Sequence, residues 1–134
     1  MSRKLFVNLP VEDLDASVAF FTKLGFAFDP NLTDENAGCM SVNDDTSVML
    51  LVKKRFSDFT DKTIVDARTS TEALFTISAE RRGEVDQLVN TAVAHGGRTV
   101  DDPQDHGFMY DWGFEDLDGH NWGVMWMDVS QTPS

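Results

Sequence analysis

The sequence predicts an α+β fold: two tandem βαβββ modules whose curved sheets enclose a cavity. Strand-like and helix-like patterns follow one another in the same order twice, and each copy offers one helix for one face of its sheet. Curling both sheets towards each other buries the remaining faces and leaves a concave interior suited to a ligand. We expect a single domain over residues 1–134, with module one at 1–53, a linker at 54–71 and module two at 72–129.

Module one begins with a predicted strand at 4–9, which Pro10 closes. A helix is predicted at 13–24, because apolar residues recur there at intervals of three or four. Asp13 or Asp15 caps its start, and Gly25 follows its last turn. Three short strands are predicted next, at 26–29, 38–42 and 47–53. Turn-forming residues at 43–46 predict that the last two pair as a hairpin.

The connecting segment at 54–71 is polar and mixed in charge, with two isolated phenylalanines. We interpret it as the connection between the modules, with a helical turn. A mobile flap over a site is the alternative.

Module two repeats the order of module one. A strand is predicted at 73–78 and a helix at 82–95, which Gly96 ends. Three further strands are predicted at 98–100, 107–115 and 122–129. Large apolar residues alternate along the last two, and we expect them to lie beneath the helices or at an interface: Phe108, Tyr110, Trp112, Phe114, Trp122, Val124 and Trp126.

The composition is that of a globular protein, with 41% hydrophobic and 25% charged residues. A formal net charge of −12 argues against nucleic acid and against an anionic membrane surface as partners. Cys39 is the only cysteine, so no disulfide can form within the chain, which fits a reducing compartment. No stretch has the length of a signal-peptide core or a membrane span, and we expect a cytoplasmic protein.

Two motifs carry a family resemblance. The stretch LFVNLPVEDL at 5–14, followed by Leu24-Gly25-Phe26, resembles the first module of the glyoxalase / bleomycin-resistance / extradiol-dioxygenase proteins, the vicinal-oxygen-chelate superfamily. FEDLDGH at 114–120 resembles their last hairpin. The resemblance implies the glyoxalase/bleomycin-resistance/dioxygenase fold and a homodimer. Function stays open, because this scaffold serves isomerases, dioxygenases, transferases and drug-binding proteins.

The resemblance also implies where a divalent metal would bind in the metal-dependent relatives. The position of the first-strand ligand falls on Phe6, which cannot coordinate a metal, and the last-strand glutamate falls on Gly123, which has no side chain. The matching position of module two falls on or next to Glu72. On the seventh strand, His106 stands where the extradiol enzymes have a histidine, but their tyrosine falls on Gly113. We therefore expect no metal and no other cofactor.

Period-two alternation, in the register that the family implies, places residues in the cavity. The expected binding residues are Phe6, Asn8, Leu74, Met109, Asp111 and Met125. Glu72 and His106 are the candidate catalytic residues, although a solvated carboxylate and a hydrogen-bonded loop histidine are the plainer interpretations.

Three hypotheses follow. The first is a binding module or degenerate relative of the enzymes, which binds a small, partly apolar molecule without metal. The second is a metal-dependent lyase or dioxygenase whose ligands have moved to Glu72, His106 and Asp111 or Glu115. The third is a metal-free enzyme with Glu72 or His106 as its base.

Overall fold

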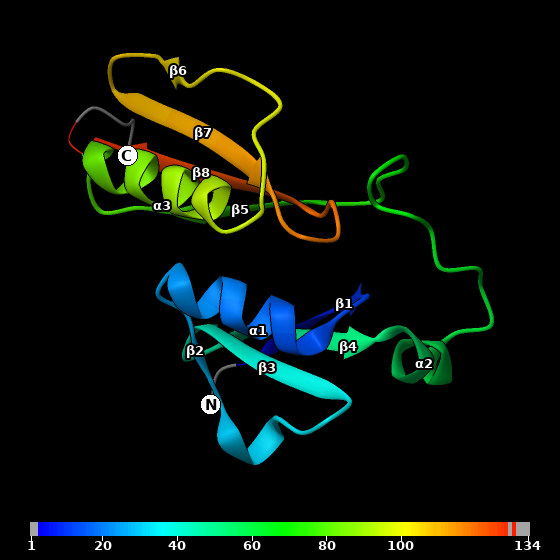
Figure 1. Ribbon diagram of the computed structural model, residues 1–134. Coiled ribbons are helices and arrows are strands. Elements are labelled where there is room, and N and C mark those ends of the chain that lie inside the picture. The colour runs from blue at the N-terminus through cyan, green and yellow to red at the C-terminus, as the bar shows by residue number, and fades with distance from the viewer. Residues whose placement is uncertain (1–2, 129, 131–134) are drawn as a thin grey trace. The chain divides into compact units, whose positions relative to one another are not determined.

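A computed structural model describes residues 3–128 and 130 of the chain and divides it into two compact units, residues 1–65 and 66–134. The division falls inside the predicted linker. Each unit is a four-stranded mixed sheet with one long helix, and neither sheet closes into a barrel (Figure 1). None of the helices described is long and apolar enough to cross a membrane.

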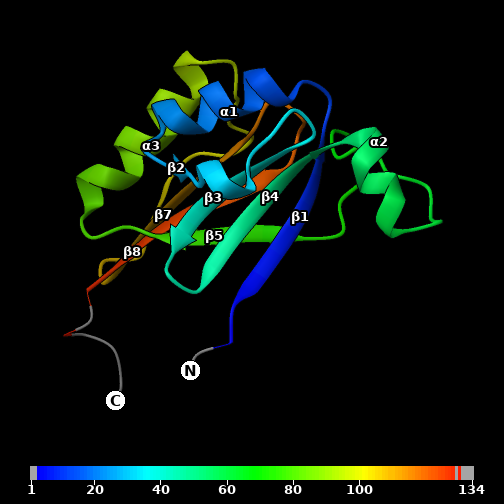
Figure 2. The same ribbon diagram turned by 90° about the horizontal axis from the view of Figure 1, so that it is seen from below.

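The first unit runs β1 (Leu5–Val11), α1 (Leu14–Lys23), β2 (Ala27–Phe28), β3 (Ala37–Asn43) and β4 (Thr46–Val52). Its strand order is β1-β4-β3-β2, with β1 parallel to β4 and the other pairs antiparallel. Figure 2 shows β3, β4 and β1 side by side. A short 3₁₀ turn, η1 (Pro30–Leu32), links β2 and β3.

The second unit has the same order of elements: β5 (Leu74–Ser78), α3 (Arg82–Ala94), β6 (Gln104–Asp105), β7 (Met109–Glu115) and β8 (Asn121–Met127). Its strand order, β5-β8-β7-β6, has the same parallel and antiparallel pairings as the first sheet. The prediction of two βαβββ modules is therefore confirmed.

Local chemistry fixes the helix ends as the sequence predicts. The Asp13 carboxylate accepts a hydrogen bond from the backbone N–H of Ala16 at 3.1 Å and caps α1. Gly25 and Gly96 follow α1 and α3 with φ of 100° and 108°, a left-handed conformation that other residues adopt at a cost. The predicted helical turn in the connection is also present, as α2 (Lys53–Phe56) and the 3₁₀ turn η2 (Ser57–Phe59).

We expected Pro10 to close the first strand. It lies instead inside β1, opposite Leu51 of β4. β1 is an edge strand with β4 as its one neighbour, so a residue without an N–H donor can be accommodated there.

The strand predicted at 98–100 is wrong. Arg98 makes a single bridge to Glu115, and the short second strand of the module is β6, at Gln104–Asp105. Its ladder with β7 begins only after Pro103, which has no N–H to donate.

Phe108 also departs from the prediction, because it is 43% exposed rather than buried beneath a helix. The Asp105 carboxylate accepts from the N–H of Gly107 at 2.9 Å, and Gly107 has a φ of 85°. This turn ends the alternation, so β7 begins at Met109. The last strand ends at Met127, and Val129, where we expected it to end, lies outside the described residues.

Alternation along β7 and β8 otherwise holds. The α3 face of the second sheet carries Tyr110 and Trp126, which contact Asp86 and Arg82 of the helix. The same face buries the core of the unit, which includes Phe114, Trp122, Val124, Val85, Val89 and Ala92. Residues of the opposite parity lie on what we call the open face, the side of the second sheet away from α3.

Candidate functional site

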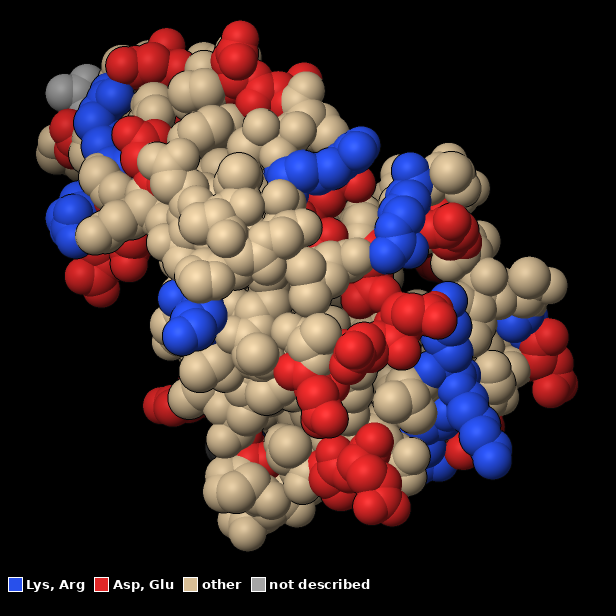
Figure 3. Space-filling view, in the orientation of Figure 1, with Lys and Arg blue, Asp and Glu red and all other residues tan. Residues whose placement is uncertain are grey.

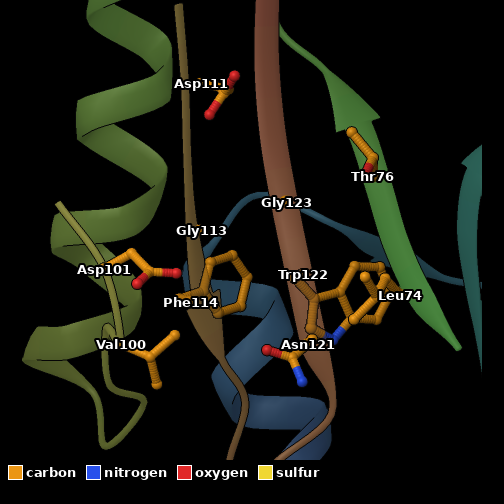
Figure 4. Close-up of a pocket in the computed structure, with 10 residues that line it drawn as sticks. All are labelled: Leu74, Thr76, Val100, Asp101, Asp111, Gly113, Phe114, Asn121, Trp122 and Gly123. Carbon is orange, nitrogen blue, oxygen red and sulfur yellow. The ribbon is translucent and has the colours of Figure 1, made fainter. Parts of the chain in front are cut away.

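A groove of about 340 Å³ hollows the second sheet (Figure 4). Most of the strand residues that line it belong to the open face, whereas Phe114 and Trp122 have the parity of the α3 face. All the residues that line it belong to the second unit: Leu74, Thr76, Val100, Asp101, Asp111, Gly113, Phe114, Asn121, Trp122 and Gly123. This volume is at the lower end of the range typical of small-molecule sites.

Two glycines make the floor of the groove. Gly113 of β7 and Gly123 of β8 are paired directly across the ladder, so the sheet is bare of side chains at this point. Thr76 of β5 pairs with Gly123 from the other side. In Figure 4 the two glycine positions lie next to each other, below Asp111 and to the left of Thr76, with the ring of Trp122 below them. A ligand can therefore approach the backbone itself.

The walls of the groove are apolar on two sides. Leu74 at the start of β5 is 72% exposed and Val100 is 56% exposed, both unusually open for aliphatic side chains. Thr76 and Asn121 add a hydroxyl and an amide. The groove thus combines apolar surface with a few polar groups, as small-molecule sites commonly do.

Two carboxylates, Asp101 and Asp111, line the β7 side of the groove. The carbonyl of Asp101 accepts from the indole Nε1 of Trp112 at 2.9 Å, which fixes the backbone there. Asp111 lies 3.5 Å, carboxylate oxygen to imidazole Nε2, from His106. None of the ten lining residues is basic.

Asp101 belongs to a strap, residues 98–107, that runs from the end of α3 to the turn before β7. At one end, Arg98 and Glu115 exchange two backbone hydrogen bonds, and the Arg98 Nε donates to the Glu115 carboxylate at 3.1 Å. At the other end, the Arg82 guanidinium donates to both oxygens of Asp105 at 2.9 Å and to the Gly107 carbonyl at 2.7 Å.

Arg82 is held in turn by two aromatic rings. Its guanidinium carbon lies 5.3 Å from the ring centre of Tyr110 and 5.0 Å from that of Trp126. The hydrogen bonds from Arg82 and from the Gly107 N–H lower the pKa of Asp105 to about 2, and the same carboxylate raises the pKa of Arg82. The strap is therefore anchored by a charge pair that persists at any ordinary pH.

Titration of the Tyr110 hydroxyl can be followed without interference, because Tyr110 is the only tyrosine in the chain. Its hydroxyl donates to the Asp86 carboxylate at 2.6 Å, and this hydrogen bond, together with burial, raises its pKa to about 12. The stabilisation that the Tyr110–Asp86 hydrogen bond gives to the fold is fully present below pH 10, the ordinary pKa of tyrosine. It is lost as the pH rises through about 12.

We expect tyrosinate absorbance at 295 nm to rise with a midpoint near pH 12 in the wild type, and at lower pH in Asp86→Asn, which lacks the carboxylate charge. Far-UV circular dichroism at each pH controls for unfolding. A midpoint near 10 in protein that is still folded would contradict the Asp86 contact.

The turn between β7 and β8 is built on a buried carboxylate. Asp116 is 6% exposed; one of its oxygens accepts from the N–H groups of Asp118 and His120, and the other from Trp122 Nε1, all at 3.0 Å. Burial raises the pKa of Asp116, while His120 and the three N–H donors oppose that shift. The turn aligns β7 with β8 and so brings Gly113 opposite Gly123.

Comparisons with known proteins agree with this architecture. A family model described as "Bleomycin resistance protein-like N-terminal" matches residues 3–43. A hypothetical protein from S. aureus is similar at 28% identity and a TM-score of 0.79, covering 93% of this chain and 94% of that one. A glyoxalase-related enzyme from Fulvimarina pelagi is similar at 20% identity and a TM-score of 0.79, covering 96% and 91%.

A third structure, a glyoxalase/bleomycin resistance protein/dioxygenase family enzyme from Burkholderia phytofirmans, is similar at 15% identity and a TM-score of 0.77, with coverage of 94% and 99%. The chain has the glyoxalase/bleomycin-resistance/dioxygenase fold. The resemblance to the vicinal-oxygen-chelate superfamily is confirmed at this level. Comparison with curated proteins gave no match.

The metal of the metal-dependent glyoxalase/dioxygenase proteins does not fit the side chains present. Within residues 3–128 and 130, no group of three or more His, Cys, Asp or Glu side chains could hold a metal ion. Phe6 offers no donor atom, and a Cβ at Gly123 would already meet the Thr76 hydroxyl at 3.1 Å. Glu115, a candidate for a relocated ligand, is buried and paired with Arg98.

The predicted site residues fall in three places. Leu74 and Asp111 line the groove, and Met125 lies directly opposite Asp111 on the same face, with Met109 two residues along β7. Phe6 and Asn8 belong to β1 of the first unit, where both are exposed. That both modules contribute to one cavity stays a prediction.

The two candidate catalytic residues are separated. His106 contacts Asp111 at the rim of the groove. Glu72 is exposed, precedes β5 rather than beginning it, and does not line the groove. Its proposed role as a base therefore has no structural support beyond its sequence position.

Three groove residues were missed in the sequence. Asn121 has the same parity as Gly123, and extending the alternation by one step predicts it. Val100 ended the strand predicted at 98–100, which does not form, and Asp101 gave no signal. Both residues lie in a connection whose path periodicity does not determine.

Proposed function

We propose that the protein binds a small, partly apolar molecule in the groove of the second sheet, and that it does so without the divalent metal of its enzyme relatives. The bare glycine pair at the floor of the groove supports this most directly, because it opens the sheet backbone to a ligand between the exposed Leu74 and Val100. A homodimer in the cytoplasm remains part of the proposal.

Binding is tested by thermal shift against aldehydes, catechols and antibiotics. We expect at least one compound class to raise Tm by several degrees, since a ligand at a hundredfold excess over its Kd adds about 2.7 kcal/mol. Gly123→Val should remove the shift by filling the floor, and Leu74→Ala should reduce it without affecting folding. Ser78→Val, on the same face of β5 but outside the groove, is the matched control.

A shift that survives in both groove variants would place the site elsewhere, and no shift with any class would overturn the proposal.

Metal content is tested separately, on protein purified without a metal-chelating tag. We expect far less than one Zn, Ni, Mn or Fe per chain, because the donor set is incomplete. Stoichiometric metal that resists dialysis would overturn the metal-free proposal and favour a lyase or dioxygenase with relocated ligands.

A second candidate function is a metal-free enzyme, favoured by one contact, that of His106 with Asp111 at the groove. It predicts turnover that survives a chelator and is lost in His106→Asn. Unchanged turnover in that variant would exclude His106 as the base.

A further inference from the structure

The charged side chains that line the groove are all acidic. The lining includes two carboxylates, a hydroxyl and an amide, and no Lys or Arg. The Asp101 carboxylate has no hydrogen-bond donor within the described part of the chain, and Asp111 has only His106, at 3.5 Å. A ligand is therefore offered acceptors and negative charge rather than a place for an anion.

The surroundings increase this effect. The chain carries 23 acidic against 11 basic residues, and Figure 3 shows acidic side chains spread over the visible face. The two basic side chains that anchor the strap are already paired, Arg98 with Glu115 and Arg82 with Asp105, so neither is paired with Asp101. The field at the groove attracts cations and repels anions.

The apolar part of the ligand follows from the other walls. Leu74 and Val100 offer exposed aliphatic surface, and the paired glycines between them leave a bare strip of backbone. A hollow of about 340 Å³ holds a body of one or two rings and excludes a large antibiotic.

We propose that the groove selects small amphipathic amines: a one- or two-ring apolar body over Gly113 and Gly123, with a protonated amine held by Asp101 and Asp111. This inference rests on the proposed binding function and names its ligand class. The amine supplies the donor that Asp101 lacks and a further one for Asp111 beside His106, while the ring covers the apolar walls.

Three naphthyl compounds of nearly equal shape test the charge: naphthylmethylamine, naphthalenemethanol and naphthoate, measured by isothermal titration calorimetry at low and high salt. Because Asp101 is exposed and Asp111 is only half-buried, each should contribute modestly, and we expect the amine to bind about fivefold more tightly than the alcohol. The naphthoate should bind most weakly. High salt should reduce the preference.

Asp101→Asn and Asp111→Asn should each lower amine affinity about two- to threefold and leave the alcohol unchanged. Asp102→Asn is the matched control, since Asp102 is an exposed neighbour that does not line the groove. All three substitutions are isosteric, and Asp101 and Asp102 are exposed while Asp111 is half-buried, so folding should be retained.

The outcomes separate the two proposals. If the alcohol or the naphthoate binds as tightly as the amine, the amine class is wrong while the groove stands. If Asp101→Asn and Asp111→Asn both keep the wild-type preference for the amine over the alcohol, these two carboxylates are not the charges that select it. If none of the three compounds binds, or if all bind Gly123→Val as well as the wild type, the groove itself is overturned as the site.

Discussion

Replacing Asp116 by asparagine is expected to lower the free energy of unfolding by about 2–3 kcal/mol, and replacing it by alanine to lower it further. The two carboxylate oxygens accept three N–H donors, and an asparagine amide presents one N–H₂ group where an acceptor is needed. In either orientation a buried donor faces a donor. Alanine removes the acceptor of all three N–H groups. Urea denaturation at neutral pH measures both costs.

The control is Asp102→Asn, an exposed change of the same kind, which should stay within about 0.5 kcal/mol of the wild type. Trp122→Phe removes one of the three donors, so Asp116→Asn should cost less in that background than alone, by about 1 kcal/mol. Strictly additive costs would show that the indole hydrogen bond contributes nothing to the effect.

Much of the fold could be predicted because its signals are local. The helix at Leu14–Lys23 follows from an apolar stripe, a capping Asp13 and Gly25, all within one short stretch of sequence. The repeat of the order of elements then predicts the second sheet from the first. Boundaries failed where a tertiary contact decides: Arg98 contributes one bridge instead of a strand because the chain meets Glu115 only at that residue.

Alternation along the strands predicts which strand residues face the candidate site, but it does not predict the residues that the strap contributes. Alternation correctly assigns Leu74, Asp111 and Gly123 to one face, because a strand has a fixed period of two. It cannot place Asp101, whose position depends on Arg98 and Arg82 anchoring the strap at its two ends. Those anchors join residues that are far apart in the sequence.

The same distinction applies to the two candidate bases. His106 reaches Asp111 because the turn at Asp105–Gly107 folds the chain back onto β7. Glu72 has no such turn to direct it, and it lies outside the β5 ladder. Family position makes both residues candidates, whereas the contacts favour only His106.

Gly113→Ala is expected to destabilise the protein by about 2 kcal/mol, and Gly123→Ala by much less, although the two glycines form one cross-strand pair. A Cβ at Gly113 would lie 2.9 Å from the carbonyl oxygen of Trp122, part of the neighbouring strand, so the ladder itself would have to shift. A Cβ at Gly123 would meet the Thr76 hydroxyl at 3.1 Å, a side chain that can rotate away.

Urea denaturation of the two alanine variants tests this difference, with Gly123→Ala in a Thr76→Ala background as the control in which the contact is relieved. Equal costs for the two glycines would contradict it. The distinction bears on function, because packing alone explains why position 113 is glycine, whereas folding tolerates a side chain at position 123. If Gly123→Ala folds normally yet loses ligand binding, the absence of a side chain there serves the groove rather than the sheet.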